Sequence, residues 1–338
     1  MNELAGRLQT YLRAKLGEPD LTVSGLARIP GGASRETYRF RAKSGGHERG
    51  LILRRDPPAS LIETERSAEY RAYEAFHALG LPVPAPVALE LDPAPLERPF
   101  FIMEEIENCQ TGSILAPDPF GPHAQKIGEQ FFTVMGKIAA PDPRDIGLND
   151  FEGETDIHNV AMHEVARWEK VIDEDELEPQ PIVRAAIRWL KRNPPPPAQK
   201  ISVVHGDYRT GNFLFDSDGT IRAILDWEMA HLGDPLEDLG WAIDPLWAGG
   251  NPGRPGGMIP RAEAIALWER ASGLKADPVA LHWWEIFASL KGAAIWISAA
   301  REYAEGRNID PINAFSGWFC LAFHNKVLAD RLSVEAQA

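Results

Sequence analysis

Four polar side chains in one short segment constrain this chain more than any other feature. His205, Asp207, Asn212 and Asp226 stand at the ends of strand-like apolar runs. The second and third runs are joined by the turn sequence Asp-Ser-Asp-Gly, whose residue types favour a tight reversal. A hairpin of this kind brings the loop before its first strand and the loop after its second strand to one edge. We therefore expect Asp207, Asn212 and Asp226 to lie together.

These three side chains offer carboxylate and amide oxygens at strand exits. A carboxylate in such a position can face a cleft and accept a proton. Oxygen ligands also suit Mg²⁺, which keeps part of its water shell and binds phosphate oxygens, whereas histidine and cysteine clusters with zinc spacing are absent from the sequence. One carboxylate as base, beside an Asn/Asp pair on a metal, is an arrangement suited to phosphoryl transfer. The alternative is that these residues merely cap strand ends.

Strand-like and helical patterns divide the chain into two regions. Strand-like runs and one long helix come first, at 21–29, 38–43, 50–55, 62–79 (the helix), 85–91 and 100–106. Helical periodicity then predominates, at 124–140, 159–171, 183–192, 261–272, 278–303 and 312–332. Three short strand-like runs interrupt it at 201–204, 212–215 and 221–225. We expect an α+β protein with a small antiparallel-sheet lobe over residues 1–105 and a large helical lobe over 106–338.

Charge and cysteine content narrow the classes of partner. The 338 residues carry a net charge of −14, of which −13 lies beyond Glu105, so a nucleic acid would be repelled. No apolar run approaches the ~20 residues of a membrane span, and the N-terminal segment is an amphipathic helix rather than a signal peptide. Two cysteines without an export signal predict a cytoplasmic protein. All ten tryptophans lie beyond Glu105, so this acidic region is either a surface over a tryptophan-rich core or an aromatic-lined cleft for a cation.

Two stretches carry a resemblance to a known family. HGDYRTGNFLFD and ILDWEMAHLGDPLEDLGW resemble the aminoglycoside phosphotransferase and choline kinase group, which has a protein-kinase-like two-lobe fold. The resemblance is closest to the branch of kinase domains attached to acyl-CoA dehydrogenases. It implies that Asp207 is the catalytic base for a substrate hydroxyl, and that Asn212 and Asp226 hold Mg²⁺ on the phosphates of ATP. Gly206 and Trp227 stand where protein kinases have Arg and Phe, which favours a small-molecule kinase.

The same resemblance implies a nucleotide-binding role for the small lobe. The loop over the ATP phosphates would contain Gly31, Gly32 and Ser34. The hinge beside the adenine would contain Met103, Glu104 and Ile106. The alternative for the glycine pair is an ordinary hairpin turn, and the hinge match depends on backbone groups more than on side chains.

The resemblance also implies a phosphate-binding cation and its helical partner. Arg54 would bind phosphate where many kinases use Lys, with Arg55 as the alternative. Glu69 would orient this cation, with Glu65 on the same helical face as the alternative. Both glutamates would otherwise belong to a solvated helix face.

A downstream element, Gly233-Asp234-Pro235 followed by Asp238, resembles the family's brace for the catalytic loop. Asp234 is either a third metal ligand or a helix N-cap, and Pro235 at a first helical position favours the cap. We expect His231 to be structural, and Arg209 is a candidate contact for phosphate or substrate.

Together these features predict an ATP- and Mg²⁺-dependent kinase that phosphorylates a hydroxyl of a small molecule. The acceptor would be a hydroxy acid or hydroxyacyl group, or an amino-alcohol or aminoglycoside. Two alternatives remain: a non-catalytic nucleotide-binding regulator on the same fold, and a metal-dependent hydrolase that uses His205, Asp207 and Asp226. The sequence predicts no oligomeric state.

Overall fold

The computed structural model describes most of the chain. The described residues are 2–29, 36–56, 66–113, 115–116, 118–251 and 253–335. They form two compact units: Met1–Gln110 with Arg222–Met229, and Thr111–Ile221 with Ala230–Ala338. The segment that carries Asp226 therefore folds with the strand-rich first unit, although most of its sequence neighbours belong to the helical second unit.

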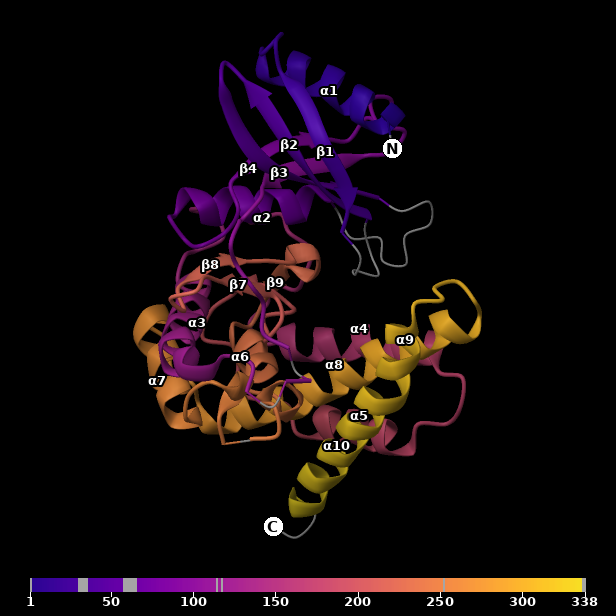
Figure 1. Ribbon diagram of the computed structural model, residues 1–338. Coiled ribbons are helices and arrows are strands. Elements are labelled where there is room, and N and C mark those ends of the chain that lie inside the picture. Colours follow the sequence, from indigo (N-terminus) through magenta and orange to yellow (C-terminus); the bar gives the residue numbers. More distant parts are fainter. Residues whose placement is uncertain are drawn as a thin grey trace. The chain divides into compact units, whose positions relative to one another are not determined.

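A five-stranded antiparallel sheet forms the centre of the first unit (Figure 1). Its strands, in spatial order, are β1 (Thr22–Arg28), β2 (Glu36–Ser44), β3 (His47–Arg55), β5 (Phe100–Glu104) and β4 (Pro86–Glu90). Side chains alternate along β5, so the ring of Phe100 lies 4.9 Å from Tyr11 of α1 (Asn2–Leu16), and Phe101 lies 6.2 Å from Tyr73 of α2 (Arg66–Ala78). The two helices thus cover opposite faces of the sheet, and the predicted strand-rich lobe is confirmed.

The turn between β2 and β3 fixes the register of this sheet. Ser44 pairs with His47, which leaves a two-residue turn of Gly45 and Gly46 with φ angles of 56° and 83°. Two successive positive φ angles are typical of the hairpin turns that match the twist of paired strands, and glycine adopts them without steric cost. The resulting register places Arg54 in a central strand, between β2 and β5.

The segment Arg222–Met229 is anchored in the first unit on both sides of Asp226. On one side, β8 (Ile221–Ile224) ends where Ile224 N–H donates to the carbonyl of Pro82 at 2.7 Å. On the other side, η2 (Trp227–Met229) begins with a buried indole that stacks on Phe76, with ring centroids 4.6 Å apart.

The second unit is mainly helical, as predicted. Its helices are η1 (Gly121–His123), α3 (Ala124–Ala139), α4 (Val160–Asp175), α5 (Pro181–Arg192), α6 (Leu236–Ala242), η3 (Pro245–Ala248), η4 (Pro255–Gly257), α7 (Arg261–Ser272), α8 (Pro278–Ala304), α9 (Pro311–Phe315) and α10 (Leu321–Glu335). Its strands are β6 (Ser202–Val204), β7 (Phe213–Phe215) and β9 (His231–Gly233). The sequence did not predict β9, which pairs antiparallel with β6; its residues, His231-Leu232-Gly233, do not form an apolar run.

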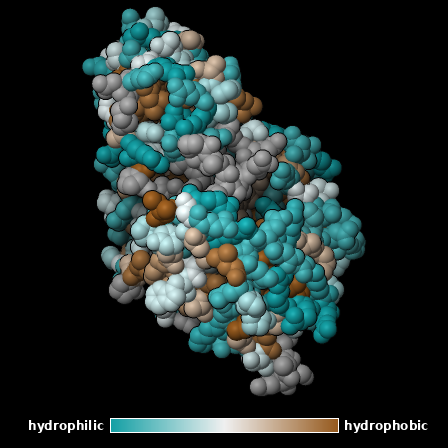
Figure 2. Space-filling view, turned by 90° about the vertical axis from the view of Figure 1, so that its right-hand side faces the viewer, coloured by the Kyte–Doolittle hydropathy of each residue, from teal (hydrophilic) through white to brown (hydrophobic). Residues whose placement is uncertain are grey.

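Tryptophans build much of the buried interior, which favours the core interpretation of the tryptophan-rich region. Seven of the ten are at most 7% exposed, while Trp318 is 74% exposed. In α8, Trp283 stacks on Phe287 one helical turn later, with ring centroids 5.8 Å apart. On the face seen in Figure 2, hydrophilic residues predominate and hydrophobic residues lie in small groups. Among the described residues, no helix combines the length and the hydropathy that crossing a bilayer requires.

The helix predicted at 312–332 is interrupted. It consists of α9, a π-helical turn over Ser316–Cys320, and α10. Within the turn Cys320 is buried and Trp318 is exposed. A single wide turn adds one residue per turn locally, which an average periodicity of 3.6 residues does not reveal.

Candidate functional site

The loop after β6, which we call the Asp207 loop (His205–Asn212), carries the predicted base. β6 is fully buried, and the chain leaves it through Gly206, whose φ of 82° favours glycine. The N–H of Asp207 donates to Nδ1 of the buried His205 ring at 3.1 Å. The strand and this local bond therefore fix where the Asp207 side chain leaves the backbone.

Three side chains donate to the Asp207 carboxylate. Asn212 Nδ2 donates to Oδ2 at 2.6 Å and also to the Asp207 carbonyl at 2.9 Å. Trp241 Nε1 of α6 donates to Oδ1 at 2.9 Å. Arg209 Nε lies 2.9 Å from Oδ1 and 3.2 Å from Oδ2. The structure thus brings Asp207 and Asn212 together, and it holds the carboxylate in a defined orientation.

Arg209 lies beside this carboxylate on an aromatic surface. Its guanidinium carbon is 4.9 Å from the centre of the Trp247 ring, which is within cation–π range. The Arg209 side chain is 27% exposed, so a fixed positive charge next to Asp207 remains accessible to solvent. The sequence indicated Arg209 only as a candidate contact and gave no sign of Trp241 or Trp247, because the tertiary fold alone brings these indoles to the loop.

The main chain of the Asp207 loop is braced by Asp238 of α6, as the downstream motif suggested. Its Oδ2 accepts from His205 N–H at 2.7 Å, and its Oδ1 accepts from Gly206 N–H at 3.0 Å. Burial raises the pKa of Asp238, although its hydrogen bonds oppose that shift. Both carboxylate oxygens are thus used to hold consecutive peptide groups.

Asp234 lies just before α6, and both of its carboxylate oxygens accept hydrogen bonds from the protein. Its Oδ1 accepts from the N–H of Leu236 at 2.9 Å, and its Oδ2 accepts from Trp284 Nε1 at 3.1 Å. Burial raises the pKa of Asp234 to about 6. The N-cap residue of α6 is Pro235, one residue later than predicted, while Asp234 accepts from the first residue of the helix.

In the first unit, Arg54 joins two carboxylates. From β3 it donates through Nη1 to Oε1 of Glu69 in α2 at 2.6 Å, and through Nη2 to Oδ1 of Asp226 at 3.1 Å. Burial opposes the charge of this guanidinium, but Glu69 and Asp226 outweigh burial and hold the pKa of Arg54 well above its usual value. The alternative cation, Arg55, binds Glu36 instead, with Nη2 and Oε2 at 2.7 Å. The structure therefore places Arg54, rather than Arg55, beside Glu69.

Asp226 has an unusual backbone. Its φ is 71°, a left-handed conformation that few residues other than glycine adopt, although Asp and Asn tolerate it better than most. Its N–H donates to the hydroxyl of Tyr73 at 3.0 Å. Backbone strain of this kind is found at functional sites, where the surrounding structure holds it in place. Asp226 belongs to the first unit and Asp207 to the second, so their predicted approach stays a prediction.

The remaining predicted nucleotide contacts are placed only in part. Gly31, Gly32, Ser34 and the alternative Glu65 lie outside the described residues. Met103 is buried in β5, Glu104 ends that strand, and Ile106 follows it. The N–H of Glu104 donates to the carbonyl of Ala85 at 2.9 Å, so this group belongs to the sheet. A contact between adenine and the backbone of this segment stays a prediction.

The predicted metal ligands offer donor atoms of the right chemistry. The side chain of Asp226 is 35% exposed. Asn212 uses its Nδ2 toward Asp207, which leaves the amide oxygen as the atom on the other side of the group. Carboxylate and amide oxygens are hard ligands of the kind that Mg²⁺ takes together with phosphate oxygens and water. Both residues therefore fit this metal chemically.

Comparison with known proteins identifies the family. The model of the phosphotransferase enzyme family matches residues 25–274, which include both β3 and the Asp207 loop. The chain belongs to this family. Among curated relatives of the phosphotransferase-family chain, mouse acyl-CoA dehydrogenase family member 10 is 28% identical over 243 residues, covering 70% of this chain and 22% of that protein. Human acyl-CoA dehydrogenase family member 11 is 24% identical over 271 residues, covering 76% and 34%. The chain thus spans about a fifth to a third of the length of these relatives.

Solved structures show that this phosphotransferase-family protein has the kinase-like fold expected. A Ralstonia eutropha protein, provisionally named an aminoglycoside phosphotransferase, matches with a TM-score of 0.76 at 24% identity, covering 97% of this chain and 98% of that one. A thermostable mutant of aminoglycoside phosphotransferase APH(4)-Ia, in a complex with AMP-PNP and hygromycin B, matches with a TM-score of 0.61 at 18% identity over 98% and 99%. Macrolide 2′-phosphotransferase type I gives 0.59 at 19% identity over 94% and 96%.

Proposed function

We propose that this protein is a small-molecule kinase that transfers the γ-phosphate of ATP to a substrate hydroxyl. One observation carries the proposal: in a chain of the phosphotransferase family, Asn212 donates 2.6 Å to an Asp207 carboxylate that Trp241 and Arg209 also orient. Phosphoryl transfer needs little covalent chemistry from the protein, and it depends mainly on positioning and charge neutralisation. A pre-oriented carboxylate beside an amide oxygen suits that requirement.

In this mechanism Asp207 accepts the proton of the acceptor hydroxyl while the hydroxyl oxygen bonds to the γ-phosphorus. ADP leaves with the electrons of the broken P–O bond. Asn212 and Asp226 would hold Mg²⁺, which neutralises phosphate charge when it is bound. Arg54 would bind phosphate oxygens through its guanidinium, with Glu69 keeping that group in place. The Arg209 bond to Asp207 is the one we expect to loosen when the acceptor hydroxyl approaches, because Arg209 is partly exposed.

The position of Arg209 also bears on the acceptor. A guanidinium next to the base would attract an anionic group on the acceptor and would repel a polycation. We therefore favour hydroxy acids and hydroxyacyl groups over aminoglycosides and other amino-alcohols as acceptors. Structural neighbours such as APH(4)-Ia, crystallised with hygromycin B, share the fold at 18% identity, which leaves the acceptor open to experiment.

An ADP-release screen tests both parts of this proposal. It would compare hydroxy acids, hydroxyacyl thioesters, sugars, choline-type alcohols and aminoglycosides, with Asp207→Asn as the blank for each. We expect Asp207-dependent ADP release with an anionic acceptor, and a lower kcat/KM for that acceptor in Arg209→Met. Release with aminoglycosides alone would overturn the acceptor class but keep the kinase. Binding of Mg·ATP without ADP release with any acceptor would favour the non-catalytic regulator. Metal-dependent ester cleavage without ATP would favour the hydrolase.

A further inference from the structure

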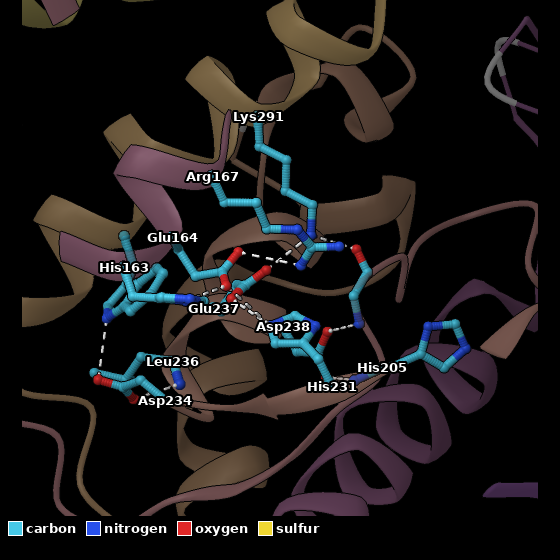
Figure 3. Close-up of polar contacts among 12 residues, drawn as sticks. His163, Glu164, Arg167, His205, His231, Asp234, Leu236, Glu237, Asp238 and Lys291 are labelled. Atoms are coloured by element: carbon cyan, nitrogen blue, oxygen red, sulfur yellow. Dashed lines mark hydrogen bonds and ion pairs between the residues drawn. The ribbon is translucent and has the colours of Figure 1, made fainter. Parts of the chain in front are cut away.

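A buried cluster of charged side chains contacts the main chain of the Asp207 loop (Figure 3). The buried cluster consists of Glu164 of α4, His231 of β9, Glu237 of α6 and Lys291 of α8, each at most 3% exposed. His231 Nε2 lies 3.1 Å from Oε2 of Glu237 and 4.0 Å from Oε1 of Glu164. Lys291 Nζ lies 2.8 Å from Oε1 of Glu237. The cluster therefore joins α4 and α8 to β9 and α6, which follow each other directly in the sequence.

Side chains supply the positive charge in this cluster. Burial opposes the ionisation of Glu237, but Lys291 and His231 outweigh burial and lower its pKa. Burial also opposes the ionisation of Glu164, and there His231 is the largest of the influences that lower the pKa. The ligand atoms of Glu164, His231 and Glu237 lie within 4.8 Å of one another, close enough to share a metal ion. However, the Lys291 ammonium already contacts Glu237, and Arg167 Nη1 lies 3.5 Å from Glu164. A metal ion would have to displace cations that the fold provides.

Lys291 connects this cluster to the peptide group that precedes the base. Its Nζ donates to the carbonyl of Gly206 at 2.5 Å. The N–H of the same peptide group belongs to Asp207 and donates to His205 Nδ1. Gly206 has a φ of 82° and no side chain, so the loop is most free to rotate at this residue. Lys291 and His205 therefore hold the two ends of the peptide that sets the direction of Asp207.

Lys291 also reaches the base through an aromatic ring. Its Nζ lies 5.4 Å from the centre of the Trp241 ring, within cation–π range. The Nε1 of that ring donates to Oδ1 of Asp207 at 2.9 Å. A cation over the face of an indole draws electron density toward itself and makes the indole N–H a stronger donor. One buried ammonium thus acts on both the backbone and the carboxylate of Asp207.

We propose that Lys291 is a positioning residue for phosphoryl transfer, and that Glu237, His231 and Glu164 hold its ammonium in place. The inference rests on the proposed function, in which Asp207 is the base. A misplacement of a reacting group by about 1 Å can cost on the order of 100-fold in rate. Loss of the Lys291 bond should therefore lower kcat strongly and leave nucleotide affinity nearly unchanged.

The test uses two variants of the full chain. Lys291→Met removes the ammonium but leaves Glu237 as a buried carboxylate without its lysine, so we expect this variant to be strongly destabilised. Lys291→Met/Glu237→Gln removes both charges, and the glutamine retains an oxygen that can accept from His231. Leu328→Ala, a cavity variant at a fully buried position in α10, serves as a control that is destabilised without any change to the cluster.

We expect the double variant to melt higher than Lys291→Met, to bind Mg·ATP within about twofold of wild type, and to lose about 10- to 100-fold in kcat. Hydrogen exchange of the backbone amides of residues 203–207 should also be faster than in wild type and in Leu328→Ala. Wild-type kcat and unchanged exchange in a folded double variant would overturn the inference and leave the proposed function intact.

The exchange measurement separates the two claims. If the wild-type protein phosphorylates no acceptor but exchange still rises in the double variant, the proposed function fails and Lys291 retains its role in holding the loop. If exchange is unchanged as well, both claims fail. Binding of Mn²⁺ or Zn²⁺ by the wild-type protein, and its loss in Glu237→Gln, would show instead that the cluster binds a metal.

Discussion

At Asp207, donors from Asn212, Trp241 and Arg209 share two carboxylate oxygens. Such a carboxylate is oriented before an acceptor arrives, which reduces the reorganisation that transfer requires. Asn212 lies five residues from Asp207, and its hydrogen bond to Asp207 reflects a local motif that the sequence displays. Trp241 arrives from α6, so nothing near Asp207 in the sequence could have indicated it.

The contribution of Trp241 can be measured with Trp241→Phe, which keeps the aromatic ring and removes the N–H. A hydrogen bond to a charged group contributes about 1.5–3 kcal/mol, so we expect kcat to fall by about tenfold or more. Steady-state kinetics with Mg·ATP saturating would show it. Trp283→Phe is the matched control, because it removes another buried indole N–H, one that donates to the carbonyl of Leu190 at 3.2 Å. Equal losses in both variants would assign the effect to stability.

Asp226 offers a second test of a single residue. Asn tolerates the φ of 71° found here, so Asp226→Asn should keep the backbone while removing the charge from the proposed metal ligand. We expect weaker Mg·ATP binding in calorimetry, with a melting temperature close to that of wild type. Asp226→Ala should lower both the Mg·ATP affinity and the melting temperature, since alanine adopts a positive φ less readily. Unchanged Mg·ATP affinity in Asp226→Asn would count against the metal role.

At the scale of elements, α6 and α8 determine where the brace of the Asp207 loop lies. Periodicity predicted α8 well because its pattern is long, and the cap residues predicted the start of α6. It did not predict that Lys291 of α8 would contact Gly206, since helix packing sets that contact. The predicted hairpin turn is present, with Asp216 N–H donating to the carbonyl of Thr220 at 3.0 Å. The segment with Asp226 that follows nevertheless folds with the first unit, through Trp227 and Phe76.

The close packing of α6 on α8 depends on Gly240. A Cβ at this position would lie 2.9 Å from the carbonyl oxygen of Trp284, a backbone atom of α8 that cannot move cheaply. We expect Gly240→Ala to destabilise the protein by about 1–3 kcal/mol, as overpacking of a core does. Chemical denaturation would measure it. Gly6→Ala in α1 is the control, because a Cβ there meets nothing within 4 Å and should stabilise the helix by up to about 1 kcal/mol. Similar behaviour of the two variants would contradict this description of the helix contact.

At the scale of the whole molecule, the buried cluster should make stability depend on pH. Burial lowers the pKa of His231, but Glu237 and Glu164 outweigh burial and raise it above the ordinary 6.5. Protonation of His231 therefore contributes fully below pH 6.5, and the contribution is lost as the pH rises through the higher folded-state pKa. Glu237 and Glu164 have lowered pKa values, so their contributions are lost only in acid.

The measurement is the free energy of unfolding against pH for wild type and His231→Gln. We expect the wild-type value to fall above pH 6.5 and the variant value to fall less. His231 is assigned from the difference between the two curves, because other groups titrate in the same pH range. The hydrogen bond to Glu164 raises the pKa of His163, and burial raises the pKa of Asp234 to about 6. The substitution leaves the Arg167 and Lys291 side chains in place beside Glu164 and Glu237. Parallel curves would show that His231 carries no linked proton.

The most direct test of the central claim is transfer of label from γ-labelled ATP to the hydroxyl of an acceptor. We expect labelled acceptor with the wild-type protein, and a rate lower by about 10²- to 10⁴-fold in Asp207→Asn, with Mg·ATP affinity retained. Label that stays on ATP or appears only as inorganic phosphate with every acceptor class, or transfer at an undiminished rate in Asp207→Asn, would contradict it.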